Sequence, residues 1–316
     1  MLPKGYKKTC YACSRKSSPC VGAEQSAARL KTCNGGSVTA VLYVVATPIG
    51  NLADMSERAI AVLREVDLLA AEDTRHSAVL MRHFAIEAPA VAYHEHSGEA
   101  VERRIATCWE SGGSVALISD AGTPLISDPG YRLVRLAQAL GVQVSPIPGA
   151  CAAIAALSVS GLPTDRFAFE GFLPAKAQAR EQYLADLVDS TATLVFYEAP
   201  HRVGECLQSM AMVFGEQREA VLAREISKTF ETIRRAPLGE LLAFVMSDPN
   251  QRRGEIVLVV AGADKGESAI DSALVQLMLS LASEMPPRKA AQLLADYSGV
   301  RKKRLYQCYL DAAQKR

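Results

Sequence analysis

The stretch LYVVATPIGN, residues 42–51, decides the fold class of this chain of 316 residues. Its first half is an unbroken apolar and β-branched run, which is typical of a strand buried on both faces of a parallel sheet. The Pro and Gly of its second half predict a turn, and Asp54 or Ser56 then caps a helix that ends near Arg64. A buried strand followed by a turn and a helix is the unit from which α/β proteins are built.

Four more apolar strands follow, with helical segments between them. We expect these strands over residues 66–72, 90–94, 115–121 and 142–148. An Ala-rich helix after Gly149 then ends near Ser160. This alternation predicts an N-terminal α/β domain over residues 41–161 with a mostly parallel sheet.

The segment GLPTD, residues 161–165, interrupts the pattern, and the strands after it alternate more between apolar and polar residues. We expect them over residues 166–173, 193–199, 219–225, 230–236 and 254–262. They predict a second α/β domain over residues 162–265 with a mixed sheet. Residues 269–316 have a helical period throughout, and two helices joined at Ser298-Gly299 resemble a helix-turn-helix.

The formal net charge of +1 conceals an uneven distribution. Residues 1–40 hold seven Lys and Arg against one acid, have no hydrophobic period, and are interpreted as a disordered or non-native tail. The stretch 286–316 holds eight Lys and Arg against two acids, which favours contact with a polyanion. The chain has neither a membrane-length apolar run nor a secretory signal, so we expect a cytoplasmic protein with no membrane contact.

Eight cysteines raise the question of a metal site. Cys10 and Cys13 form one C-x-x-C, but neither a second C-x-x-C nor a spaced pair of histidines follows it. We therefore expect no metal, and we interpret the cysteines beyond the tail as reduced thiols in apolar surroundings.

Gly- and Pro-rich loops at the predicted strand ends are the best candidates for a binding site. The chain lacks the glycine fingerprints of dinucleotide and Walker ATP sites. In open parallel sheets, ligands bind beyond the carboxyl ends of the strands. Four loops lie at such positions: ATPIGN (46–51), SDAGTPLISDPG (119–130), PIPGACAA (146–153) and EAPHR (198–202). Each alone is explained by a turn, but together they predict a site.

These loops and their flanking segments resemble the tetrapyrrole methylase-like (class III) methyltransferases, and within them the subgroup that acts on ribosomal RNA of the small subunit. The resemblance is carried by LYVVATPIGNLADMSERA, AAEDTRHS, SDAGTPLISDPGYRLV, PIPGACAAIAALSVSGLPTDRFAFEGFLPAK, FYEAPHR, ARE-SKTFETI and RGEIVLVVAG. It implies two α/β domains with S-adenosylmethionine in the cleft between them, plus a small helical C-terminal module. It also implies a homodimer and 2′-O-methylation of a cytidine in the decoding region of 16S rRNA.

The resemblance also implies which residues bind the cofactor. Relatives place a Gly-Asp-Pro loop against it, and here that loop reads Gly122-Thr123-Pro124, so a carboxylate contact would have to come from Asp120 or Asp128. Ile126 is expected to give a backbone contact. The remaining expected contacts are Pro48 and Gly50 in the first loop, Cys151 and Ala152 along the methionine part, and Glu198, Ala236 and Pro237 around the adenine.

A ribose hydroxyl is a poor nucleophile, so methyl transfer to it calls for a general base. The candidates at strand ends are Glu72, Asp73, His94, His96, Glu198 and His201, with Arg75 and Arg202 as partners for a phosphate or a carboxylate. We expect Glu72, Asp73 and Arg75 to form the substrate side of the site, with His94 or His96 as the alternative base. A helix cap at Asp73 or Thr74, an ion pair between Glu72 and Arg75, and a histidine hydrogen bond between the domains are the structural alternatives.

The C-terminal basic cluster is the expected RNA contact. The second helix of the expected helix-turn-helix begins with four basic residues, Arg301, Lys302, Lys303 and Arg304. These side chains suit phosphate contacts that position RNA without specifying its sequence. A solvated helix face is the structural alternative. Two rival functions remain open: a precorrin-type tetrapyrrole methyltransferase, and a non-catalytic ribosome-binding protein with a vestigial cofactor site.

Overall fold

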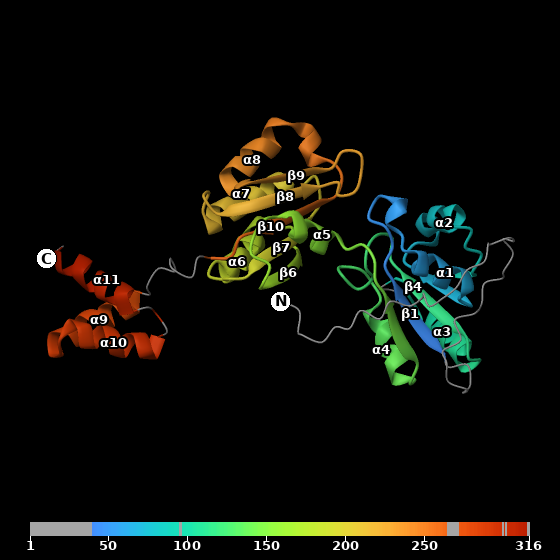
Figure 1. Cartoon of the computed structure of the whole chain (residues 1–316), viewed down its shortest axis with the longest axis horizontal. Coiled ribbons are helices and arrows are strands. Elements are labelled where there is room, and N and C mark those ends of the chain that lie inside the picture. The colour runs from blue at the N-terminus through green and yellow to red at the C-terminus, as the bar shows by residue number, and fades with distance from the viewer. Residues whose placement is uncertain (1–39, 95–96, 264–271, 299, 301, 315–316) are drawn as a thin grey trace, which may run out of the picture. The chain divides into compact units, whose positions relative to one another are not determined.

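The computed structural model describes residues 40–94, 97–263, 272–298, 300 and 302–314 (Figure 1). Residues 1–39, with Cys10 and Cys13, lie outside this part of the chain, as do His96 and Arg301. Within it the chain forms two five-stranded sheets with helices packed on them, followed by three further helices. The α/β fold expected from the alternating pattern is confirmed.

The first sheet is parallel throughout and has the strand order β3-β2-β4-β1-β5. Its strands are β1 (Val41–Val45), β2 (Leu68–Ala71), β3 (Ala90–Ala92), β4 (Ser114–Ile118) and β5 (Gln143–Ile147). Since the strands are parallel, the loops that follow them meet at one edge of the sheet. The order reverses between β1 and β4, the position where open α/β sheets bind their ligands.

Helices cover both faces of this sheet. Those of the first half are η1 (Leu52–Asp54), α1 (Glu57–Glu65), α2 (Thr74–His83), α3 (Glu99–Glu110) and α4 (Tyr131–Ala139). Apolar residues of α1 pack in one core cluster with β1, β2 and β4, and those of α3 and α4 pack in a second cluster that includes the other side chains of the same strands. This two-sided burial is the reason why the strands read as continuous apolar runs.

The capping residues settle an alternative that the sequence leaves open. Ser56 is the N-cap of α1, and its hydroxyl accepts a hydrogen bond from the Ala59 amide, whereas Asp54 belongs to η1. Asp73 is the N-cap of α2. Both helices therefore begin where a side chain satisfies an amide that the helix itself leaves unpaired.

The second sheet is mixed, with the order β6-β7-β10-β8-β9. Its strands are β6 (Phe167–Phe172), β7 (Thr193–Glu198), β8 (Glu219–Arg224), β9 (Thr232–Pro237) and β10 (Ile256–Val260), and only the β6–β7 pair is parallel within it. One face packs on α6 (Ala177–Leu187), α7 (Val203–Phe214) and α8 (Leu238–Ser247). The other face packs on α5 (Ala152–Val159), which follows the first sheet.

The C-terminal helices are α9 (Ser272–Glu284), α10 (Pro287–Ser298) and α11 (Lys302–Gln314). They share a small core of their own, formed by Met278, Ala290, Ala291, Leu294 and Leu305. The break between α10 and α11 falls where the sequence predicts the turn. No helix among the described residues is long and apolar enough to span a membrane.

Phe196 tests the core of the second sheet. It lies on β7, is 0% exposed and packs among the side chains of the α6–α8 face. Replacing a buried Phe with Ala removes its burial and leaves a cavity, so we expect Phe196→Ala to lower the free energy of unfolding by about 3–5 kcal/mol. Urea unfolding measures this loss. Phe230→Ala is the matched control, since Phe230 is 72% exposed, and an equal loss in both variants would contradict this account.

Candidate active site

The loops that follow β1, β4 and β5 are tied to one another by hydrogen bonds. Thr47 and Gly122 form an isolated antiparallel bridge, in which each amide donates to the other carbonyl at 2.8 and 3.1 Å. The Thr123 hydroxyl donates to the Ala150 carbonyl at 2.9 Å. Gly122 has a φ of +84°, a conformation that favours glycine. Three of the four loops expected to form a site are therefore one connected wall.

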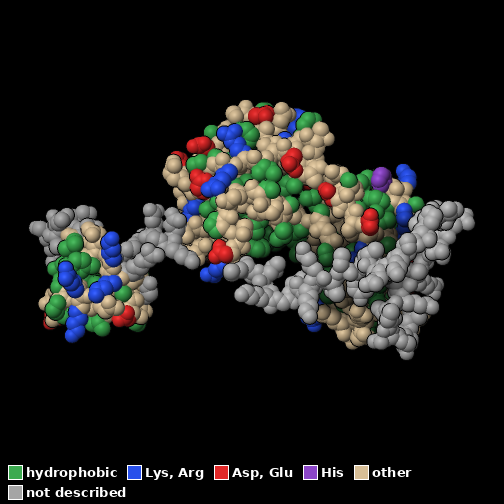
Figure 2. All heavy atoms as spheres, viewed as in Figure 1, with side chains coloured by type: hydrophobic (Ala, Val, Ile, Leu, Met, Phe, Trp, Pro, Cys, Tyr) green, Lys and Arg blue, Asp and Glu red, His purple; other side chains and the backbone are tan. Residues whose placement is uncertain are grey.

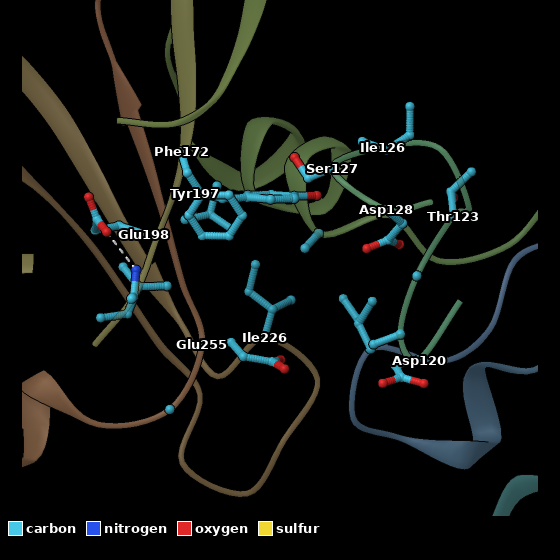
Figure 3. A pocket seen from close by; sticks show the side chains of 18 of the residues that line it. Asp120, Thr123, Ile126, Ser127, Asp128, Phe172, Tyr197, Glu198, Ile226 and Glu255 are labelled. Atoms are coloured by element: carbon cyan, nitrogen blue, oxygen red, sulfur yellow. Dashed lines mark hydrogen bonds between the residues drawn. The ribbon is translucent and has the colours of Figure 1, made fainter. Parts of the chain in front are cut away.

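A cavity of about 410 Å³ lies against this wall (Figure 3). Its volume is within the range typical of small-molecule sites. The first half of the chain contributes Ile49, Asp120–Thr123, Ile126–Asp128 and Ala152, and the second half contributes Phe172, Tyr197–Pro200, Ile226 and Gly254–Val257. The lining is mostly apolar, with a few acidic groups, as in sites that bind a small organic molecule.

The apolar wall of the cavity centres on Tyr197. Phe169 and Phe172 meet its ring edge to face, with centroid distances of 4.9 and 5.8 Å. The Tyr197 hydroxyl accepts a hydrogen bond of 3.1 Å from the Ala153 amide in the first turn of α5. Burial raises the pKa of Tyr197 well above its usual value, so the phenol stays neutral. The aromatic wall is thus fixed in orientation and carries no charge.

Asp128 is the carboxyl group inside the cavity with the most altered titration (Figure 3). Burial, helped by the charges of Glu72 and Asp120, raises its pKa to about 6, while a hydrogen bond from Ser119 opposes the shift. A cation entering the cavity would stabilise the ionised form. Asp128 is therefore suited to bind a positively charged ligand.

A hydrogen-bonded rim connects this cavity to the EDTRHS segment. The Asp120 amide donates to Glu72 Oε2 and the Asp73 amide donates to Asp120 Oδ1, both at 3.3 Å. The other Asp120 oxygen lies 3.5 Å from His76 Nδ1. Asp120 lines the cavity, so it links the cavity to the start of α2.

Asp73 has the structural role that the sequence left as an alternative. Its carboxylate accepts from the Arg75 amide at 2.8 Å and pairs with the Arg75 guanidinium at 2.8 Å. The hydrogen bonds from Arg75 hold the pKa of Asp73 far below its usual range. The ion pair that Arg75 forms is thus with Asp73 and not with Glu72, the partner considered as a structural alternative. Glu72, Asp73 and Arg75 are not among the residues that line the cavity.

The histidines predicted as bases are not brought to the cavity. His94 is exposed, with its amide donating to Ser97 Oγ at 2.8 Å, and His201 is exposed before α7. Neither lines the cavity. His96 lies outside the described residues, as Arg301 does, and nothing is described of the Arg304 side chain.

Glu198 and Arg202 differ from their expected roles. Glu198 borders the cavity, but its side chain is 1% exposed and turns away, accepting from the Ala199 amide at 2.8 Å (dashed in Figure 3) and from the Cys206 thiol. Arg202 Nε lies 3.4 Å from the same carboxylate, and its guanidinium donates to the Leu173 carbonyl at 2.7 Å. These bonds hold the cavity wall together, and the RNA contact expected of Arg202 stays a prediction.

Of the other expected cofactor residues, Asp120, Gly122, Thr123, Ile126, Asp128 and Ala152 line the cavity. Pro48, Pro124 and Cys151 sit beside lining residues without lining it themselves. The neighbouring Gly50 accommodates the Lys228 side chain where a Cβ would collide with it.

Ala236 and Pro237, expected to contact the adenine, do not line this cavity. Ala236 packs in the core on the helix-covered face of the second sheet, and Pro237 pairs with Glu219 at the end of β9. The lining residues that sequence reasoning missed are largely those of the second sheet, namely Phe172, Tyr197, Ile226 and Glu255.

Comparison with known proteins agrees with this geometry. The model of the Tetrapyrrole (Corrin/Porphyrin) Methylases matches residues 41–242, and that of the RsmI C-terminal HTH domain matches residues 268–313. "Ribosomal RNA small subunit methyltransferase I" of Pseudomonas aeruginosa is 59% identical over 268 residues, covering 84% of this chain and 95% of that protein. The protein of the same name from Escherichia coli O157:H7 is 49% identical over 270 residues, covering 85% and 94%.

The chain belongs to the ribosomal RNA small subunit methyltransferase I family of tetrapyrrole methylases. Solved structures support the fold of this family. Uroporphyrin-III-C-methyltransferase from Thermus thermophilus superimposes with a TM-score of 0.51 at 20% identity, covering 70% of this chain and 94% of that one. Diphthine synthase gives 0.53 at 15% identity, covering 71% and 90%.

Members of the family use S-adenosylmethionine as the methyl donor. The cavity fits this molecule in its chemistry. Phe172, Ile126 and Ile226 offer apolar surface to an adenosine, and Asp128 offers a carboxylate to a molecule that carries a sulfonium and an ammonium. These residues, with the Asp120–Thr123 segment and Ala152, are the ones that would hold it.

We expect Asp128 to make the affinity for this cofactor dependent on pH. A carboxyl with a pKa of about 6 is ionised above that pH and protonated below it, and the cation prefers the ionised form. We expect affinity to be about tenfold lower near pH 5 than at neutral pH. Asp128→Asn should bind weakly with little dependence on pH in titration calorimetry. Asp165→Asn, at an exposed position, is the control, and an Asp128→Asn variant that keeps the pH dependence would refute the assignment.

Proposed function

We propose that the chain transfers the methyl group of S-adenosylmethionine to the ribose 2′-hydroxyl of a cytidine in the decoding region of 16S rRNA. The observation that carries the proposal is the match of residues 268–313 to the RsmI C-terminal HTH domain, beside relatives named for the small-subunit rRNA reaction. A methylase of small tetrapyrroles has no evident use for a basic helical module. The exposed Lys302 and Lys303 at the start of α11 suit a phosphate backbone.

The cofactor, when bound, supplies an electrophilic methyl group on a sulfonium. The protein's own contribution is then to hold the two reactants in line, to exclude water and to accept the hydroxyl proton. The tied loops after β1, β4 and β5 and the Tyr197 wall provide the positioning, because hydrogen bonds within the protein hold them in place.

We assign proton acceptance to His76, with Asp120 as its positioning partner. Asp120 Oδ2 lies 3.5 Å from His76 Nδ1, which leaves Nε2 free to face a substrate. Asp73 is poorly suited to the task because Arg75 and the helix amides stabilise its charge. The Glu72 carboxylate accepts from the Asp120 amide and the Asp73 amide donates to the Asp120 carboxylate, so the EDTRHS segment as a whole forms the substrate side.

His76→Ala should lower kcat by about 10²–10⁴-fold while leaving the affinity for S-adenosylmethionine unchanged. Asp120→Asn should lower kcat less, since it disturbs the orientation of the imidazole without removing it. His83→Ala, on the same helix, is the control. A His76→Ala variant with the wild-type rate would show that another group is the general base.

The function itself is tested with methyl-labelled S-adenosylmethionine and small ribosomal subunits that lack their modifications. Label in 16S rRNA that makes one linkage resistant to alkali is the expected result, because a 2′-O-methyl group blocks alkaline cleavage at that nucleotide. Label found in the RNA bases would support rRNA as the substrate but contradict the 2′-hydroxyl as the methyl acceptor. Cofactor binding without RNA label would favour the alternatives.

A tetrapyrrole substrate is the second candidate, because the model that matches residues 41–242 is that of the corrin and porphyrin methylases. Offering a porphyrinogen in the same assay separates the two. A chain that binds the cofactor and methylates neither substrate would be the non-catalytic ribosome-binding protein.

The homodimer implied by the resemblance stays a prediction. Sedimentation of the purified chain at two concentrations checks it, and a concentration-independent monomer would reject it.

A further inference from the structure

Helix α10 carries an exposed stripe on the side opposite to the core of the C-terminal module. Ala290, Ala291 and Leu294 face inward. Leu293 and Tyr297, four residues apart, share the outward face, where Leu293 is 47% and Tyr297 86% exposed. A tyrosine exposed to this extent has no packing role in the described module.

Positive charge surrounds the stripe in sequence and along the helix. Lys289 lies one turn before Leu293 on the same face and is exposed. Lys302 and Lys303, also exposed, open α11 just after the turn that follows Tyr297. The acid on α10, Asp296, accepts a hydrogen bond of 2.8 Å from Gln292. On the visible face of these helices, Lys and Arg side chains lie next to hydrophobic ones (Figure 2).

We propose that this stripe binds an unpaired nucleotide of RNA, whose base stacks on Tyr297 and whose flanking phosphates contact Lys289, Lys302 and Lys303. The inference rests on the proposed function and names the form of RNA that the module recognises. An exposed aromatic ring in a module that also presents lysines combines the two features by which proteins bind single-stranded RNA. Leu293 provides an apolar surface beside the ring.

The size of the stripe favours a nucleotide over a protein partner. A stable protein interface buries roughly 800 Å² on each partner, far more than two side chains provide. A single base needs only one ring to stack on, and the surrounding lysines complement a polyanion. Phosphate contacts alone would leave the exposure of Tyr297 without a function.

The test uses the full chain and a short single-stranded RNA that carries 2-aminopurine, with the same RNA paired to its complement as a second probe. Stacking quenches the fluorescence of 2-aminopurine. We expect Tyr297→Ala to lose the quench and to weaken binding of the single strand by roughly ten- to hundredfold, because one stacked base is lost. Tyr297→Phe should keep both, and Tyr131→Ala, at an exposed tyrosine of α4, should behave as wild type.

Salt dependence separates the two parts of the surface. Lys302→Gln with Lys303→Gln should lower the slope of log affinity against log salt by about 2, whereas Tyr297→Ala should leave the slope unchanged. Equal affinities of wild type and Tyr297→Ala for the single strand would overturn the proposal. So would a Tyr297→Ala defect seen only with assembled subunits, because it indicates a protein contact. Methylation of subunits by the same wild-type preparation reports separately on the proposed function.

Discussion

The two backbone hydrogen bonds between Thr47 and Gly122 are the constraint on which the site depends. The loops that carry these residues leave the sheet after β1 and β4, where regular strand pairing ends. The bridge pairs one more residue of each chain segment beyond the sheet, and the hydrogen bond of the Thr123 hydroxyl connects these two loops to the loop after β5. Because the wall is ordered on folding, a ligand does not have to order it on binding. Through this bond the Thr123 side chain faces the neighbouring loop, and a carboxyl group that this part of the wall presents to the cavity is that of Asp128.

The fold was predictable from sequence further than the site. Buried parallel strands such as Leu68–Ala71 are recognisable because both faces exclude water, and so the whole run is apolar. The cavity wall of the second sheet lacked such a signal, since Tyr197 and Phe172 resemble core residues and only the packing around β6 and β7 decides which of them face a ligand. Glu198, by contrast, was predicted as a ligand contact and is not free to be one. It follows a strand as a ligand would, but its carboxylate is satisfied by Ala199, Cys206 and Arg202, partners that sequence spacing does not reveal.

Two carboxyl groups near this edge illustrate how surroundings divide roles among similar residues. Asp73 caps α2 and pairs with Arg75, so its charge is stabilised and its pKa lies far below the usual range. Asp128 lies in the apolar cavity near Glu72 and Asp120, so burial raises its pKa to about 6. The first is held ionised as a structural element, and the second is ready to respond to the charge of a ligand. In the sequence both residues are acids in strand-end loops, and nothing there distinguishes their roles.

The acidic character of the rim has a consequence for the polyanionic substrate that we propose. Glu72, Asp120 and Asp128 attract a cationic methyl donor, but the same charges repel the phosphates of RNA. Affinity for RNA then has to come from another part of the chain, and the described C-terminal helices carry the exposed Lys289, Lys302 and Lys303. A cavity selected for a cation and a separate basic module for a polyanion satisfy two opposite electrostatic requirements in one chain. The net charge of the chain stays near zero because the acidic middle of the chain is balanced by the two basic ends, residues 1–40 and 286–316.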